Sequence, residues 1–230
     1  SDFFSAMTKN MQIDNLHGIN FISFYPYYRS DFERMIKRMM DIVFSTLGII
    51  VLSPILITIS LMILIKDGRP VLFSWKVMGY NRKPIKSWKF RTMVNNADEL
   101  KKELIGKNEM KGPMFKMDKD PRILPFAHFL RKYSLDELPQ LFSVLKGDLS
   151  LVGPRPPLRY EFDEFKLWQM RKLSVKPGLT CLWQVSGRND INDFDDWVKL
   201  DLEYIDNWSI LLDIKILYQT ILTVIKGSGK

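Results

Sequence analysis

The sequence predicts a mainly α-helical fold that has a small β-hairpin and a segment embedded in a membrane. The first indication is an uncharged apolar stretch, Ile42 to Ile65, which as a straight helix would span about 36 Å, more than the hydrocarbon core of a bilayer. The second is a pair of strand-like runs on either side of a turn at residues 79–82. The third is a set of segments with helical periodicity after residue 97. A length of 230 residues fits one domain of ordinary size.

The apolar stretch contains a proline at its midpoint. Pro54 has no N–H group, so the carbonyl of Ile50 would lose its helical hydrogen bond, and Ser53 is biased away from helical angles. In lipid, an unpaired carbonyl costs several kcal/mol unless another group bonds to it. The hydroxyl of Ser53 is well placed to do so.

Two interpretations of the segment 42–65 remain open from the residues alone. One is a kinked transmembrane helix, since prolines are common in such helices. The other is a re-entrant hairpin that enters one leaflet, turns at Ser53 and Pro54, and leaves on the same side. Both flanks are basic, whereas a spanning helix is expected to have its cations on one side only. The basic residues are Arg29, Arg34, Lys37 and Arg38 before the stretch and Lys66, Arg69, Lys76, Arg82 and Lys83 after it.

The segments around this stretch are less regular. Residues 1–30 are rich in aromatic side chains and lack a clear period, so we expect a linker or leader. Residues 31–41 look like the start of a helix. Later elements are expected as strands at 71–78 and 84–93, a charged helix at 98–107, a loop at 108–125, a helix at 160–174, and an apolar helix at 209–226 that is either buried or lies in a membrane interface.

Composition limits the possible partners. The net charge of +8 predicts an anionic partner, such as lipid headgroups, phosphate-containing substrates or nucleic acid. Cys181 is the single cysteine, so an internal disulfide is excluded. The two histidines, His17 and His128, do not form a zinc-binding pattern. The sequence lacks a Gly-rich phosphate loop of the Walker or GxGxxG type.

Two adjacent carboxylates, Asp136 and Glu137, are the main candidates for chemistry. Ser134 and Glu137 have the spacing of a helix capping box, which is the commoner explanation of such a pattern. The alternative is a site for phosphate and Mg²⁺, because Mg²⁺ takes one or two carboxylates together with substrate phosphates. One carboxylate could then act as a nucleophile. Nearby cations favour this alternative: Arg131, Lys132, Lys146, Arg155 and Arg159.

Two further motifs present cations. The turn at residues 153–157 has three prolines and projects Arg155, either as a surface cation or as a preset guanidinium fork for phosphate. Lys89 and Arg91 alternate along a predicted strand, so they share one face. That pair has a simpler explanation as the charged edge of a sheet.

Taken together, these motifs resemble the catalytic domain of bacterial monotopic phosphoglycosyl transferases. The resemblance extends from about Arg34 to Lys226, and its specificity comes from many motifs in one order rather than from any single one. The matching segments are the Ser53-Pro54 break and residues 89–93, 134–140, 145–148, 153–156, 176–180, 183–188, 207–209 and 212–213. Many members have glycine where this chain has Cys181.

The resemblance implies an architecture and a set of site residues. The fold would be a membrane-embedded re-entrant helix-break-helix, with interfacial amphipathic helices, around a cytoplasmic catalytic domain at 31–230. Residues 1–30 would come from a longer protein. Asp136 would be the nucleophile and Glu137 the Mg²⁺ ligand. Contacts to substrate or phosphate would come from Lys89, Arg131, Arg155, Asp213 and Arg188.

The resemblance also implies a reaction and a location. A UDP-sugar would give its sugar-1-phosphate to undecaprenyl phosphate through a covalent aspartyl intermediate, and UMP would be released. The enzyme would require Mg²⁺ and lie at the cytoplasmic face of the bacterial inner membrane, on an anionic bilayer. The sugar cannot be identified from the sequence, and a homodimer is one option for its oligomeric state.

Two rival interpretations remain. A basic membrane-anchored adaptor without catalysis would also explain the charge and the apolar stretch. A nucleic-acid binder would explain the charge, but the basic residues are spread along the chain and form none of the familiar nucleic-acid modules. We therefore expect no nucleic-acid partner.

Overall fold

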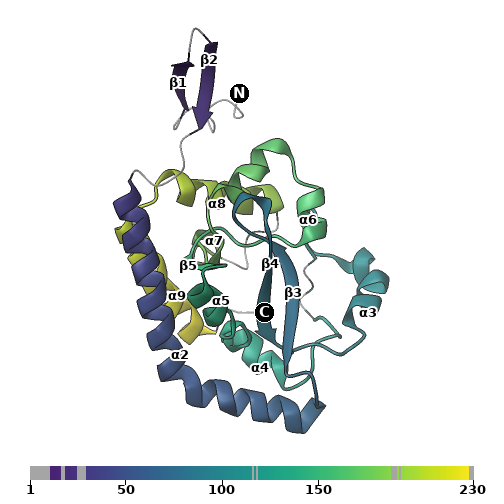
Figure 1. The fold of residues 1–230 in the computed structure, drawn as a ribbon. Coiled ribbons are helices and arrows are strands. Elements are labelled where there is room, and N and C mark those ends of the chain that lie inside the picture. Colours follow the sequence, from purple (N-terminus) through teal and green to yellow (C-terminus); the bar gives the residue numbers. More distant parts are fainter. Residues whose placement is uncertain are drawn as a thin grey trace.

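The computed structural model describes residues 11–16, 19–24, 30–115, 117, 119–187, 191 and 193–227. In these ranges it is mainly helical, with three separate two-stranded sheets, as Figure 1 shows. The prediction of a mainly helical fold with a small antiparallel hairpin is confirmed.

The N-terminal segment that we expected to be a linker contains paired strands. β1 (Met11–Leu16) and β2 (Ile19–Phe24) form an antiparallel pair with Leu16 opposite Ile19. The strands are only six residues long, which gives little room for a periodic pattern.

The apolar stretch lies within one long helix, α2 (Asp31–Asp67). Ser30 caps its start through a reciprocal capping box with Glu33, a signal that we overlooked in the sequence. By length and composition α2 could cross a membrane. Only 11% of its most apolar 18-residue segment is buried inside the protein. Figure 1 shows α2 turning sharply part-way along its length.

Helical structure continues through Ser53 and Pro54, so the expected break is a bend within one helix. The Ser53 hydroxyl donates to the carbonyl of Ile50 at 2.8 Å, as predicted. This bond replaces the one that Pro54 cannot make, so the carbonyl of Ile50 keeps a partner.

The first half of α2 is attached to the protein by two of the basic residues that precede the apolar stretch. Lys37 is buried and lies 2.5 Å from Asp213, and it also donates to the carbonyl of Val152 at 3.0 Å. Arg38 donates to the carbonyls of Val144 and Leu145 at 2.7 and 2.6 Å. These two cations therefore bind the protein itself.

The central hairpin follows α2. β3 (Leu72–Met78) and β4 (Pro84–Phe90) are antiparallel, with Phe73 opposite Lys89 and Trp75 opposite Ser87. The charged helix α3 (Ala97–Leu104) follows, and the short helix η2 (Ile105–Lys107) extends it.

The next helices are short and flank the predicted carboxylates. They are α4 (Ala127–Lys132), η3 (Leu135–Glu137) and α5 (Gln140–Lys146), and α5 packs against α2. A parallel pair of three-residue strands, β5 (Ser150–Val152) and β6 (Gly178–Thr180), had no counterpart in the prediction.

The single helix expected at 160–174 is wrong. The segment instead forms α6 (Arg159–Asp163) and a 3₁₀ helix, η4 (Leu167–Ser174). Between them Phe165 turns inward, where its ring centroid lies 5.8 Å from that of Phe162 and 5.4 Å from that of Phe194. The free energy gained by burying the Phe165 ring outweighs the preference of this segment for one continuous helix.

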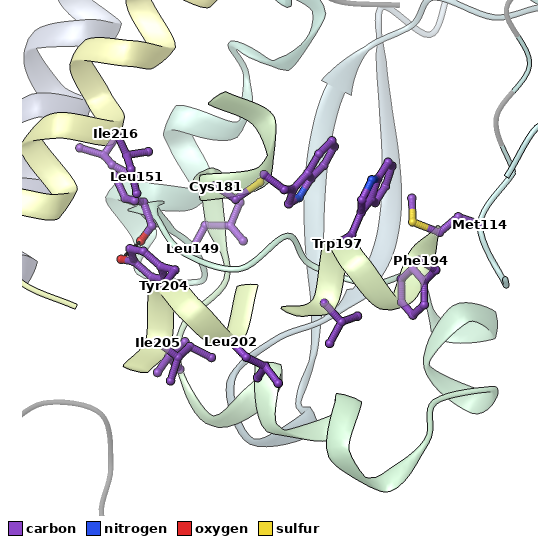
Figure 2. Packing of buried hydrophobic residues seen from close by; sticks show 14 of the residues in the cluster. Met114, Leu149, Leu151, Cys181, Phe194, Trp197, Leu202, Tyr204, Ile205 and Ile216 are labelled. Carbon is purple, nitrogen blue, oxygen red and sulfur yellow. Dashed lines mark hydrogen bonds between the residues drawn. The ribbon is translucent and has the colours of Figure 1, made fainter. Parts of the chain in front are cut away.

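The last helices build the core. α7 (Leu182–Val185) and α8 (Phe194–Asp206) meet through Trp183 and Trp197, whose rings stack with centroids 4.0 Å apart. α9 (Ile210–Lys226) follows and matches the expected apolar C-terminal helix. Figure 2 shows part of this core, where side chains from α8, β5 and α9 pack together.

Candidate functional site

A cavity of about 910 Å³ lies against the β3–β4 hairpin. Most of the residues that we predicted for the site line it. They are Lys89, Arg131, Asp136, Glu137 and Arg155. The fold thus gathers residues from one strand, two helices and a loop into a single space, where two carboxylates are faced by three cations.

Asp136 and Glu137 lie in η3, directly after α4. Ser134 adopts left-handed backbone angles with φ of 51°, which turns the chain sharply between Arg131 and the carboxylates. Within the described part of the chain, the Ser134 side chain does not form the cap that a capping box requires. The capping-box explanation is therefore wrong, and Glu137 has a different partner.

That partner is Lys89. Its ammonium lies 2.5 Å from a carboxylate oxygen of Glu137, and both side chains are largely buried. The same ammonium lies 4.3 Å from the ring centroid of Trp75, one strand away. A cation over an aromatic face is attracted by the ring quadrupole, so Trp75 and Glu137 together fix the position of Lys89.

Arg155 is held by a close approach of two backbones. A Cβ atom on Gly178 would lie 2.1 Å from the nitrogen of Gly153, so these two positions accept only glycine. Gly153 also donates to the carbonyl of Thr180 at 3.0 Å, which fixes the loop that carries Arg155.

The Arg155 guanidinium donates to Glu161 at 3.3 Å and to the sulfur of Met114 at 3.6 Å. Burial alone would lower the pKa of Arg155, but Glu161, together with Cys181 and Glu137, outweighs this effect and raises the pKa above its ordinary value. Glu161 is buried, and it also accepts from the backbone N–H of Leu158 at 2.8 Å. Glu161 therefore positions Arg155, and the sequence pattern did not single it out.

Arg131 offers a buried donor. Its Nε–H has no hydrogen-bond partner among the described residues. A buried donor without a partner is costly, and an incoming anion would remove that cost.

Arg91 also lines the cavity, but β4 ends at Phe90, so Arg91 follows the strand that was predicted to carry it. Unlike the ammonium of Lys89, its guanidinium binds the end of α2. It donates to the carbonyls of Asp67, Gly68 and Arg69 at 2.7, 3.0 and 3.1 Å, and it pairs with the Asp67 carboxylate at 2.7 Å. Arg91 therefore fastens the C-terminal end of α2 to the strand that carries Lys89.

Two predicted residues lie elsewhere. Asp213 is absent from the described residues that line the cavity; it is buried against Lys37 and accepts from the Tyr204 hydroxyl at 2.7 Å. Arg188 lies outside the described residues. Ser53 and Pro54 lie in α2.

The cavity contains groups that sequence reasoning missed. Asp120 and Arg122 form a bidentate pair with distances of 2.8 and 2.6 Å. Burial would raise the pKa of Asp120, but hydrogen bonds from Arg122 outweigh it and hold the pKa below its ordinary value. We had treated Asp120 and Pro121 as a loop signal only, although an Asp two residues before an Arg was visible in the sequence.

Cys181, at a position where the resemblance leads us to expect glycine, lines the cavity. Its φ of −146° is extended backbone that any residue adopts, so the substitution leaves the turn intact. Burial, together with the nearby Asp201 carboxylate, raises the pKa of its thiol well above the ordinary value. The thiol is therefore neutral at pH 7 and unsuited to nucleophilic attack.

The donor set limits the metal that the site could bind. The described residues contain no group of three or more His, Cys, Asp or Glu side chains suited to a metal. Asp136 and Glu137 offer one or two carboxylates, which is the number that Mg²⁺ uses when substrate phosphates complete its shell.

Comparisons with known proteins show the family of the chain. The family described as bacterial sugar transferase matches residues 32–227. The chain is 42% identical over 201 residues to an undecaprenyl-phosphate galactose phosphotransferase of Salmonella typhimurium, covering 86% of this chain and 42% of that protein. It is 34% identical to the UDP-glucose:undecaprenyl-phosphate glucose-1-phosphate transferase of Escherichia coli, covering 98% of this chain and 47% of the relative.

A shorter relative is covered almost fully. The exopolysaccharide production protein ExoY of Sinorhizobium fredii is 36% identical, and the match covers 84% of this chain and 87% of ExoY. The chain thus spans less than half of the two longer relatives and most of the shorter one. With its site of paired carboxylates and facing cations, the chain belongs to the bacterial sugar transferase family.

Proposed function

We propose that this protein transfers a sugar-1-phosphate from a UDP-sugar to undecaprenyl phosphate and releases UMP. The observation that carries the proposal is the cavity in which Asp136 and Glu137 are faced by Lys89, Arg131 and Arg155. The names of the Salmonella and E. coli relatives support the lipid acceptor, and the E. coli name supports a UDP-sugar donor. The reaction would be an early membrane step in polysaccharide assembly.

The proposed chemistry has two displacements at one phosphorus. A carboxylate oxygen of Asp136 attacks the phosphorus linked to the sugar, and the bond to the bridging oxygen breaks, so that its electron pair leaves with UMP. An aspartyl sugar-phosphate remains. An oxygen of undecaprenyl phosphate then attacks the same phosphorus, which releases the Asp136 carboxylate and forms the lipid diphosphate sugar.

The cations have separate tasks in this scheme. Arg131 would donate its unpartnered Nε–H to a phosphate oxygen, and Arg155, held by Glu161, would present a fork to another. Lys89 would hold Glu137 in place and face the transferred phosphate. Glu137 would also hold Mg²⁺, which when bound neutralises phosphate charge.

The proposed location is the cytoplasmic face of the bacterial inner membrane, with α2 re-entering one leaflet at its bend. An apolar stripe along α9 supports an interfacial position for that helix. Leu211, Tyr218 and Ile225 recur at helical spacing and are 77%, 63% and 69% exposed. A soluble donor and a lipid acceptor would then meet at the headgroup plane.

A screen for UMP release tests the proposal. Purified protein is given Mg²⁺, undecaprenyl phosphate and each of several UDP-sugars, including galactose, glucose and N-acetylated sugars. We expect UMP from at least one donor and none from Asp136→Asn. Asp163→Asn, which removes an exposed carboxylate on α6, serves as the matched control and should retain activity.

A failure of this screen would favour the rival interpretation. A membrane-anchored adaptor would bind vesicles yet release no UMP with any donor. Equal rates for wild type and Asp136→Asn would refute the assignment of the nucleophile.

A further inference from the structure

The cavity extends along the β3–β4 hairpin, and its two ends differ in chemistry. One end is set by Pro70 and Phe73, just after α2, and the other by Lys101, Phe115 and Tyr160, because Leu158, two residues before Tyr160, pairs with Val77 near the end of β3. We propose that the lipid phosphate enters at the first end and that the nucleotide of the donor binds at the second. This inference rests on the proposed function and adds a separate entrance for each substrate.

The arrangement of the elements separates the two ends. α2 leads into the start of β3, whereas the backbone N–H of Met78, at the end of β3, donates to the carbonyl of Pro157 at 2.8 Å, just before α6. A seven-residue strand is about 20 Å long. Figure 1 accordingly shows the C-terminal end of α2 and α6 at opposite ends of the hairpin.

The end near α2 is apolar and continuous with the surface of that helix. Ile65 is 82% exposed, and Leu72 and Phe73 are 39% and 47% exposed. Because Arg91 binds the last carbonyls of α2, this path is fixed relative to the strand that bears Lys89. A polyprenyl chain lying beside α2 would bring its phosphate to Lys89, since Phe73 is the direct cross-strand neighbour of that lysine.

The other end is polar and aromatic. The ammonium of Lys101 donates to the Tyr160 hydroxyl at 2.9 Å and lies 4.1 Å from the centroid of its ring. The ring of Phe115 lies 5.9 Å from the same ammonium, with the guanidinium of Arg122 over it at 4.8 Å. Flat rings and fixed donors are the groups that a nucleobase and a ribose require.

This polar end also adjoins the phosphate-facing groups. Tyr160 directly precedes Glu161, which holds Arg155. α3, which is described throughout its length, has no buried residue, so Lys101 lies on a helix that faces water. A soluble nucleotide therefore reaches this end without crossing the apolar surface.

Paired variants at the two ends test the inference. Phe73→Ala removes the apolar entrance, and Lys101→Ala removes the cation between the rings. We expect Phe73→Ala to raise the KM for undecaprenyl phosphate about tenfold, since one large apolar group is worth that much in a pocket. Lys101→Ala should raise the KM for the UDP-sugar by at least about tenfold, the value of a charge-assisted hydrogen bond. Neither variant should change the KM of the other substrate.

Two matched controls exclude general effects. Phe129→Ala removes an aromatic side chain that is 61% exposed on α4 and does not line the cavity. If Phe73 acts only by holding the protein on the membrane, Phe129→Ala will raise the lipid KM equally, and the inference fails. Lys102→Ala removes the neighbouring exposed lysine of α3 and should leave both KM values unchanged.

Equilibrium binding separates this inference from the proposed function. Titration with UMP should show weaker binding to Lys101→Ala, and titration with nanodiscs containing undecaprenyl phosphate should show weaker binding to Phe73→Ala. These measurements need no turnover, so they remain decisive if the wild type releases no UMP. A single variant that weakens both ligands would show that they share one entrance and would overturn the inference.

Discussion

At the scale of single residues, partners rather than charge decide what each cation does. Lys89 and Arg91 lie two positions apart, and the alternation predicted that they share one strand face, but β4 ends at Phe90 and Arg91 follows it. Lys89 pairs with Glu137 inside the cavity, whereas Arg91 donates hydrogen bonds to backbone carbonyls at the end of α2. The sequence predicts a shared face, but it does not reveal which element packs on that face, because that depends on contacts distant in the chain.

The Asp120–Arg122 pair gives a prediction for stability against pH. The pKa of Asp120 is lowered in the folded protein, so the pair stabilises the fold above the unfolded-state pKa of about 3.9. This stability is lost as the pH falls through the lowered folded-state pKa. We expect Asp120→Asn to reduce the free energy of unfolding by about 3 kcal/mol at pH 7, because it leaves a buried guanidinium without a counter-charge.

Denaturant unfolding in detergent at pH 7 and at pH 3 measures this difference. The difference in the free energy of unfolding between wild type and Asp120→Asn should be smaller at pH 3, since the carboxyl of Asp120 then begins to gain its proton. A difference that is the same at both pH values would contradict an electrostatic role. Asp163→Asn removes an exposed pair and should change stability by less than about 1 kcal/mol.

At the scale of elements, strong local signals were predictable and contacts between distant segments were not. The β3–β4 hairpin, α3 and α9 follow from alternation and periodicity. The parallel pair β5–β6 has three residues per strand, too few for a pattern, and depends on the contact between Gly153 and Gly178. Helix α8 was missed although its buried residues recur at helical spacing.

The bend in α2 gives a prediction at this scale. Replacing both Ser53 and Pro54 with alanine restores the helical N–H and removes the clash with the preceding turn. We expect α2 to straighten and shift toward a full membrane span. A tag placed after α2 and tested for accessibility in inverted and right-side-out vesicles measures this. A tag that stays on the cytoplasmic side in the double variant would contradict the prediction.

At the scale of the whole molecule, both ends of α2 are joined to segments of the site. Near its start Arg38 binds the last carbonyls of α5, the helix that follows the carboxylates, and Lys37 binds the end of β5, which leads to Arg155. At its other end Arg91 connects it to β4. α2 thus contacts the end of α5, the end of β5 and the residue after β4, an arrangement that the linear order of motifs did not reveal.

The site was predictable to the extent that its chemistry lies in short motifs. Lys89, Arg131, Asp136, Glu137 and Arg155 meet in one cavity as expected. Asp213 does not join them, because its carboxylate is already engaged by Lys37 and Tyr204. Positioning residues such as Glu161 act through a partner and carry no motif of their own.

The central claim is that Asp136 forms a covalent bond to the phosphate of the donor. The most direct measurement is mass spectrometry of the intact protein and its peptides. The protein is first incubated, without lipid, with Mg²⁺ and a UDP-sugar that gave UMP in the screen. We predict one equivalent of UMP, a mass increase of one sugar-phosphate on the peptide that contains Asp136, and its loss when undecaprenyl phosphate is added. Release of UMP only when the lipid is present, or an adduct that persists in Asp136→Asn, would contradict the claim.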